Sequence, residues 1–334
     1  MDRIKKTKLF VGPMSKNIVE TVINFSNNEK KYIGFIPSRR QVEYDGGYVN
    51  KWTTEQFHNF IKNKSDYILT ERDHGGPGQG LYMDDGLESY KTDSNFFNII
   101  HIDPWKKYPN YEEGLKETIQ NLRFCYLLNS ELYFEIATEE AIRPFSVEEL
   151  DKFLNDLKNK LEPELYNRIV FVVIQSGTSL KNLVNTGSYK NNKLKEMIKI
   201  VKKYGKLSKE HNGDWMKDED FISRFKNGLD GLNIAPELGT IETQVILDEL
   251  QKLDRNDLID KFYEICYNSG KWKKWVSHNF IPKENKIKLI QICGHYVFSY
   301  RDFQDIKKQL NNIDILIQKK LYEQFNLWFS FIQE

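Results

Sequence analysis

The chain has 334 residues, of which 40% are hydrophobic and 13% aromatic, so it can form one large α/β domain or two smaller ones. Its 49 basic and 48 acidic side chains nearly cancel, so no net field attracts nucleic acid or an anionic membrane, and neither is expected as a partner. Three scattered cysteines exclude a disulfide framework, and the absence of a signal sequence or a membrane-length apolar run predicts a cytoplasmic protein.

Eight short runs with strand character recur along the chain, and most are separated by segments with helical spacing. In chain order they are KLFVGPM (8–14), YIGFIPS (32–38), YILTERD (67–73), NIIHIDP (98–104), LYFEIA (132–137), IVFVVIQ (169–175), KLSKEHN (206–212) and GLNIAPE (231–237). Eight such units in about 240 residues predict an α/β fold of the TIM (β/α)8 barrel type, with a doubly wound sheet as the alternative.

The last part of the chain has a different pattern, in which large aromatic residues recur at helical spacing. We therefore expect residues 1–242 to form the barrel and residues 243–334 to form its last helix plus a C-terminal helical extension. The aromatic stripe in this extension favours a core over an interface.

Polar residues end most of the predicted strands. The active site of a TIM barrel lies where the C-terminal ends of the strands meet the βα loops, so these side chains are expected to converge. They are Ser38, Arg39, Arg40, Asp73, His74, His101, Asp103, Glu135, Gln175, His211, Asp214, Asn233 and Glu237. His101 and Asp103 alternate on one strand face, which suits a core hydrogen bond and a ligand role equally.

The motifs at these strand ends resemble a known family. The order and spacing of RQVEYDGGY, ERDHGGP, IHIDP, FEIATEE, VVIQSG, KEHNGDW and NIAPELG are similar to the large accessory (Z-type) subunits of tagatose-bisphosphate aldolase. More distantly they resemble class II fructose- and tagatose-bisphosphate aldolases. The tail segment KWKKWVSHNF resembles that of the accessory family as well, so the resemblance covers most of the chain.

The resemblance implies roles for individual residues. Asp73 matches the carboxylate that transfers a proton, and His74 and His211 match metal-binding imidazoles. Glu135 takes the place of a glutamate beside the metal, as ligand or base. The implied cofactor is a divalent metal, with Zn²⁺ as the expected ion, and the implied ligand is a sugar phosphate.

A further set of residues is expected to bind the substrate. Asn233 matches the asparagine that holds the ketose end, and the loops at Ser176, Gly177 and Gly213 match places where backbone N–H groups hold a phosphate. The arginines suit an anionic group. The full predicted set is Arg39, Arg40, Gln41, Arg72, Asp103, Gln175, Ser176, Gly177, Gly213 and Asn233.

The chain also departs from the aldolase pattern. VVIQSGTS offers Gln175 where the aldolases carry a middle metal-binding histidine, and Gln is a poor zinc ligand. Pro236 replaces the threonine expected after Asn233. Lys209 alone among the lysines sits at a predicted strand end, which slightly favours a metal mechanism over a Schiff base.

Three functions follow from these motifs. The first is a class II, metal-dependent aldolase-type enzyme that cleaves a phosphorylated ketose between C3 and C4 or inverts it at C4. The second is a non-catalytic subunit that stabilises a separate aldolase, and the third is a sugar-phosphate binding module. A second copy of the chain or a second aldolase subunit is the expected protein partner.

Overall fold

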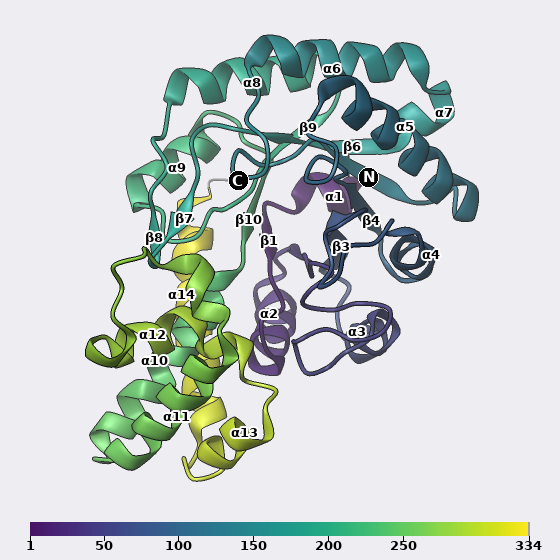
Figure 1. Cartoon of the computed structure of the whole chain (residues 1–334). Helices are drawn as coiled ribbons and strands as arrows, with labels where there is room; N and C mark the ends of the chain where they lie inside the picture. Colours follow the sequence, from purple (N-terminus) through teal and green to yellow (C-terminus); the bar gives the residue numbers. More distant parts are fainter. Residues whose placement is uncertain (333–334) are drawn as a thin grey trace.

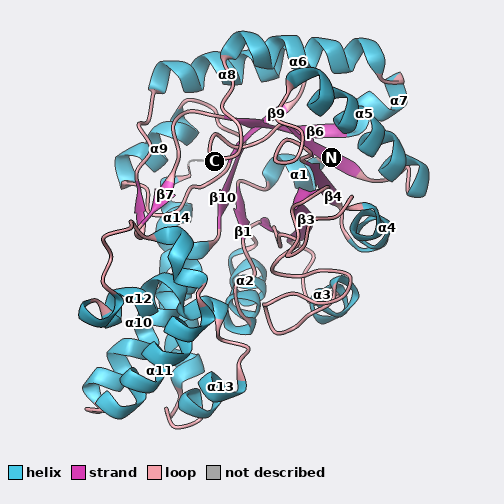
Figure 2. Ribbon diagram, viewed as in Figure 1, coloured by secondary structure: helices cyan, strands magenta, loops and turns pink. Residues whose placement is uncertain are grey.

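The structure, a computed structural model, describes residues 1–332, and its centre is a closed barrel of eight parallel strands (Figures 1 and 2). The strand order is β1-β10-β9-β6-β5-β4-β3-β2. Barrel strands that follow one another in the chain are therefore paired, and the pairing of β1 with β10 closes the barrel. The strands are β1 (Leu9–Val11), β2 (Ile33–Phe35), β3 (Ile68–Gly75), β4 (Ile99–Ile102), β5 (Tyr133–Ile136), β6 (Ile169–Ile174), β9 (Leu207–Glu210) and β10 (Gly231–Ile234). The predicted TIM barrel is confirmed, and each strand lies within its predicted run except β3, which continues past residue 73 to Gly75.

The helices that surround the barrel are α2 (Lys16–Glu29), α3 (Thr54–Ile61), α4 (Leu87–Phe96), α5 (Tyr111–Leu128), α6 (Val147–Lys160), α7 (Pro163–Arg168), α8 (Asn191–Lys203), α9 (Asp218–Lys226) and α10 (Pro236–Lys252). Of these, α2, α3, α5 and α6 begin at a side chain that caps free N–H groups. Ser15 accepts a hydrogen bond from the backbone of Ile18, and Ser146 accepts one from Glu149. Strand β6 is buried along its whole length, as expected for a parallel strand between the barrel interior and these helices.

The barrel interior changes from apolar to polar along the strands. At the N-terminal end, Ile4 of the short helix α1 (Asp2–Lys6) packs in one cluster with Phe10, Leu69 and Phe171. Charged and imidazole side chains replace them toward the C-terminal ends of the strands. The interior is therefore closed at the bottom by apolar packing, and its polar groups collect at the top.

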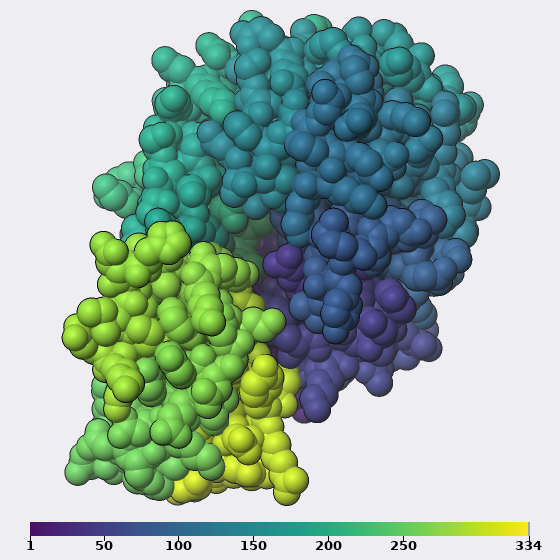
Figure 3. All heavy atoms as spheres, viewed as in Figure 1, coloured from purple at the N-terminus to yellow at the C-terminus, as the bar shows by residue number. Residues whose placement is uncertain are grey.

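A helical extension follows the barrel. It consists of α11 (Asn256–Ser269), α12 (Lys286–Cys293), α13 (Arg301–Lys307), α14 (Ile313–Phe331) and the 3₁₀ turns η1 (Lys271–Trp275), η2 (Pro282–Glu284) and η3 (Gly294–Tyr296). The boundary expected after residue 242 lies within α10, and the division into two parts stays a prediction. Figure 3 shows the extension, in green to yellow, as a lobe beside the barrel.

Helix α14 returns from the extension to the barrel wall and packs against α2 and α10 (Figure 1). Asn17 of α2 donates hydrogen bonds of 2.9 Å to Glu242 of α10 and 2.8 Å to Asp314 of α14. Phe25 lies 5.5 Å from Phe325, measured between ring centroids. The aromatic residues of α14 thus fill a core, as the sequence favoured.

The extension also touches the loop that follows β6. This loop carries a two-stranded antiparallel hairpin, β7 (Leu180–Lys181) and β8 (Val184–Asn185). The backbone N–H of Asn182 donates a hydrogen bond of 3.3 Å to the carbonyl of Trp275 in η1. None of the helices within residues 1–332 has both the length and the apolar character required to cross a bilayer.

Candidate active site

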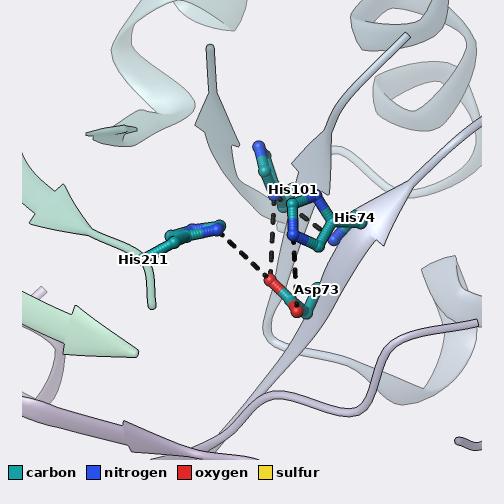
Figure 4. A group of neighbouring side chains, drawn as sticks. All are labelled: Asp73, His74, His101 and His211. Atoms are coloured by element: carbon teal, nitrogen blue, oxygen red, sulfur yellow. Dashed lines mark hydrogen bonds and ion pairs between the residues drawn. The ribbon is translucent and has the colours of Figure 1, made fainter. Parts of the chain in front are cut away.

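Four side chains from three strand ends of the barrel meet at the C-terminal mouth (Figure 4). Asp73 and His74 lie at the end of β3, His101 lies on β4, and His211 follows β9 directly. Their ligand atoms all lie within 4.8 Å of one another. The three imidazole rings are nearly equidistant, with centroids 5.1 to 5.2 Å apart. The predicted residues Asp73, His74 and His211 are therefore brought together, and His101 joins them.

The backbone of β3 is distorted where it delivers His74. The register between β3 and β4 shifts between Arg72 and Gly75, and His74 has a positive φ of 46°. A β-carbon on Gly75 would lie 2.7 Å from the carbonyl oxygen of His101, so the close approach of the two strands requires glycine. Positive φ at a residue other than glycine costs energy and collects at functional sites. Here it turns the imidazole of His74 into the mouth.

One nitrogen of each imidazole is held by a neighbouring acceptor. The Nδ1 of His74 lies 2.6 Å from the carboxylate of Asp103, and the Nε2 of His101 lies 2.9 Å from the carbonyl oxygen of Ala137. Such contacts fix the tautomer of each ring, as in metal sites where a second group orients each histidine. The opposite nitrogens turn toward Asp73, and Nδ1 of His101 also accepts a hydrogen bond of 3.3 Å from the backbone N–H of His74. Asp103, a predicted substrate residue, thus lies behind His74 rather than in front of it.

His211 follows the same rule. Its Nε2 lies 2.6 Å from Oε1 of Glu135, and its Nδ1 lies 3.8 Å from Oδ1 of Asp73. The remaining nitrogens of the other two histidines also face Asp73, at 3.8 Å for His74 and 4.0 Å for His101 (Figure 4). One nitrogen of each imidazole and the carboxylate of Asp73 therefore point at the same small volume.

Three carboxylates surround His74 at the mouth. Burial alone would lower the pKa of His74, but Asp73, Asp103 and Glu139 outweigh it and raise that pKa well above its ordinary value. Burial also opposes ionisation of Glu139, yet His74 and its other neighbours lower the pKa of Glu139 to about 2. In His101 burial prevails over the nearby carboxylates and lowers the pKa. Carboxylates that draw a proton onto a histidine would also stabilise a divalent cation at that place.

The donor set fits a divalent metal. Three imidazoles with an adjacent carboxylate are ligands that Zn²⁺ and similar ions bind, and each imidazole has its orienting partner. Asn233 donates a hydrogen bond of 3.3 Å to Oδ1 of Asp73, and its own Oδ1 is buried without a hydrogen-bond partner among the described residues. Asp103 likewise has one buried carboxylate oxygen without such a partner.

An ion network supports the centre from below. Lys209 extends between Glu71 and Glu135, and its Nζ lies 2.7 Å from a carboxylate oxygen of each. All three side chains are buried. Burial alone would lower the pKa of Lys209, but the two carboxylates raise it, so the amine stays protonated and is unsuited to form a Schiff base.

Glu135 has a supporting position that differs from the predicted one. It is fully buried and does not line the cavity at the mouth. Burial alone would raise its pKa, but Lys209, His101 and His211 lower it well below the ordinary value. Its Oε1 lies 2.6 Å from Nε2 of His211 and its other oxygen lies 2.7 Å from Nζ of Lys209, which places Glu135 behind His211 rather than in the cavity. There it orients His211.

A cavity of about 350 Å³ opens above the cluster. Its wall includes the carboxylates of Asp73 and Glu139 together with the predicted residues Arg40 and Gln41. Loops after the strands and turn η1 of the extension both contribute to it. In Figure 3 the surface is hollowed where purple, teal and yellow-green atoms meet. The cavity is therefore bounded by the barrel on one side and the extension on the other.

Two predicted substrate arginines lie outside this cavity. Arg72 is fully buried between β3 and the helices, and its guanidinium donates to Asp93, Thr54 and two backbone carbonyls. Arg39 is bound in the same way by Glu43 and Asp84. Arg72 makes five hydrogen bonds from its guanidinium and Arg39 makes four, so few or no N–H donors of these two groups remain for a ligand. Their predicted substrate role therefore has no support from their position.

The predicted phosphate loops also serve the structure. The N–H of Ser176 donates to Glu210 at 2.8 Å, so it is not free for a phosphate. Gln175 binds the carbonyls of Thr138 and Arg143. Gly177 has a φ of 100°, and Gly213 packs against Leu232; neither these glycines nor Gln175 and Ser176 line the cavity. The position of these four residues gives their predicted substrate role no support.

Sequence reasoning missed several residues of the site. The sequence assigned His101 no decided role. The third metal-binding imidazole was expected to be absent, because the resemblance placed it on the strand of Gln175. Glu139 lies in the motif FEIATEE and was given no role, although a carboxylate just past a strand end was a usable signal. Lys106 and Lys274 line the cavity, and nothing in the sequence marked them.

Comparison with known proteins adds a likeness of fold. The sequence matches no protein-family model and no curated protein. Among solved structures, a probable tagatose 6 phosphate kinase from Sinorhizobium meliloti 1021 is 13% identical with a TM-score of 0.77, over 97% of this chain and 100% of that one. The fructuronate-tagaturonate epimerase UxaE from Cohnella laeviribosi, in complex with glycerol, is 12% identical with a TM-score of 0.70, over 98% and 81% of the two chains.

An aldolase has a similar structure too. The YdjI aldolase from Escherichia coli K12 is 12% identical with a TM-score of 0.59, over 98% of this chain and 92% of that one. At these identities the likeness concerns the fold alone. The chain thus shares its barrel fold with these proteins, and its chemistry must be argued from its own residues.

Proposed function

We propose that the protein is a metal-dependent enzyme that makes or breaks the C3–C4 bond of a phosphorylated ketose, by retro-aldol cleavage or by inversion at C4. The observation that carries this proposal is the convergence of three oriented imidazoles on Asp73 at the floor of a cavity. His74, His101 and His211 would hold the metal. The fold shared with an aldolase and an epimerase supports the same class of reaction.

When bound, a divalent cation at this place supplies Lewis-acid polarisation of the substrate's carbonyl and hydroxyl oxygens. The protein's own groups must then move the proton of the C4 hydroxyl. Asp73 lines the cavity, and Asn233 holds its Oδ1 at 3.3 Å, which fixes the carboxylate in one orientation. We assign Asp73 to take and return that proton.

Glu139 is a second carboxylate on the cavity wall. Asn212 donates a hydrogen bond of 2.7 Å to it, and its low pKa keeps it ionised at neutral pH. An ionised carboxylate facing the same space can orient a substrate hydroxyl by accepting its hydrogen bond. We assign Glu139 to this positioning role, which a substitution can separate from the proton transfer by Asp73.

Asp73→Asn tests the proposal. Asn keeps the shape and one acceptor oxygen but cannot take a proton at neutral pH, so turnover should fall by about 10²- to 10⁴-fold. The assay follows aldehyde release and C4 inversion on a panel of ketose phosphates, together with metal content and melting temperature. Glu140→Gln is the matched control, because Glu140 is the neighbour of Glu139 but does not line the cavity.

Two results would overturn the proposal. The first is a metal-loaded wild type without turnover on any ketose phosphate, which would favour the non-catalytic subunit. The second is an active wild type whose Asp73→Asn variant keeps full activity, which would exclude Asp73 as the base.

A further inference from the structure

Three cationic side chains line the cavity, and they come from separate parts of the chain. Arg40 follows β2, Lys106 follows β4, and Lys274 lies in turn η1 of the C-terminal extension. Within residues 1–332 none of the three forms an ion pair with a carboxylate. Arg40 donates one hydrogen bond of 3.3 Å to the carbonyl of Gly80, and Lys106 donates one of 2.7 Å to that of Gly78. Most of their donors are therefore free to bind a ligand.

The three cations are close enough to repel one another. Desolvation, followed by the charge of Arg40, lowers the pKa of Lys106, and the same two causes lower the pKa of Lys274 to about 8. Lys274 also contributes to the shift of Lys106. Asp103 opposes the shift of Lys106 only in part. Like charges gathered without ion-pair partners repel one another, and a bound anion would reduce this repulsion.

The cavity wall divides into two chemically different parts. Asp73, His74 and Glu139 supply carboxylate and imidazole groups, and Arg40, Lys106 and Lys274 supply cations. A ligand with a polar carbonyl end and an anionic end would complement both parts. The aromatic side chain of Trp275, beside Lys274, forms part of the wall as well.

We propose that Arg40, Lys106 and Lys274 form the subsite for the substrate's phosphate group, and that Lys274 makes the C-terminal extension part of substrate recognition. The proposal rests on the proposed function, since the phosphate belongs to the ketose whose carbonyl end meets the histidines. A phosphate monoester carries up to two negative charges and three terminal oxygens at neutral pH, which matches three cations from three directions. A carboxylate is planar and would be satisfied by Arg40 alone.

Binding of methyl phosphate to the metal-free full-length protein tests the subsite directly. Titration calorimetry on wild type, Arg40→Met and Lys274→Met should show each substitution weakening the affinity roughly 10-fold or more, the usual effect of losing a charge-assisted hydrogen bond. Lys273→Met is the matched control, because Lys273 lies in the same turn but does not line the cavity. It should change the affinity less than about twofold, within the range of ordinary surface substitutions.

Acetate in the same titrations separates a phosphate subsite from a carboxylate one. We expect methyl phosphate to bind wild type roughly 10-fold more tightly than acetate, because it carries about twice the charge. Equal affinity for acetate would overturn the assignment to phosphate. Lys274→Arg keeps the charge and should retain binding, and melting temperatures establish that each variant is folded.

Failure of the subsite and failure of the proposed reaction give different results. If Lys274→Met and Lys273→Met bind methyl phosphate equally, the subsite is wrong, whatever the turnover of the enzyme. If the variants behave as expected but wild type has no turnover, the subsite stands as a binding feature and only the reaction is refuted.

Discussion

Replacing Lys209 by Met would test whether the ion network below the histidines is an electrostatic unit. Lys209 is 0% exposed, and its Nζ lies 2.7 Å from Glu71 and from Glu135, which are 1% and 0% exposed. Met fills a similar volume but leaves two buried carboxylates without a cation. Removing one partner of a buried ion pair typically costs about 3 to 5 kcal/mol, because the remaining charge stays desolvated.

Urea unfolding at pH 7 would measure this cost. With a slope of roughly 3 kcal/mol per M, the midpoint should fall by about 1 to 1.7 M. Lys203→Met is the control, since Lys203 lies at a similar 2.8 Å from Asp151 but in an exposed pair, with 56% and 36% of the side chains accessible. An exposed pair contributes about 0 to 1 kcal/mol.

The loss in Lys209→Met should also depend on pH. In the wild type, burial and Glu135 already raise the pKa of Glu71 well above its ordinary value, whereas Lys209 helps to keep the pKa of Glu135 low against burial. Without the amine, burial raises the pKa of Glu135, so the folded variant holds a further proton that the unfolded chain releases above pH about 4. The deficit relative to wild type should therefore grow between pH 5 and pH 8. If Lys209→Met loses no more stability than Lys203→Met at pH 5 and at pH 8, the charges of Lys209, Glu71 and Glu135 do not act together.

Two further substitutions address the metal centre and the pH dependence of folding. His101→Ala should weaken Zn²⁺ binding at least roughly 100-fold in a titration against a chelator, because losing a ligand exceeds the 10- to 100-fold effect of losing an orienting partner. His58→Ala in α3 is the control and should bind Zn²⁺ like the wild type. Equal affinity in the two variants would remove His101 from the ligand set. Burial and Glu237 raise the pKa of Asp214 to about 8. Between pH about 4 and 8 the folded state therefore holds a proton on Asp214 that the unfolded state has lost, so the contribution of Asp214 to stability falls as pH rises. Asp214→Asn should flatten this part of the stability profile, and an unchanged difference in melting temperature between pH 5 and pH 8 would contradict the assignment.

The barrel could be predicted from the sequence, because the pattern that indicates it is local and periodic. IVFVVI reads as a strand buried on both faces, and repeated strand–helix units predict a closed parallel sheet. The position of the site could also be predicted from the sequence. Asp73, His74 and His211 lie at strand ends, and a barrel places the C-terminal ends of all its strands at one mouth. These features require only the order of elements along the chain.

The direction in which each side chain points was decided by tertiary structure. Arg72 and Asp73 are adjacent in the sequence, but alternation along β3 sends the guanidinium outward to Asp93 and the carboxylate inward to the histidines. His101 completes the centre because the register of β3 and β4 sets its ring beside His74. Lys274 reaches the cavity only because the extension folds back over the barrel, and packing between distant segments leaves no periodic signal in the sequence.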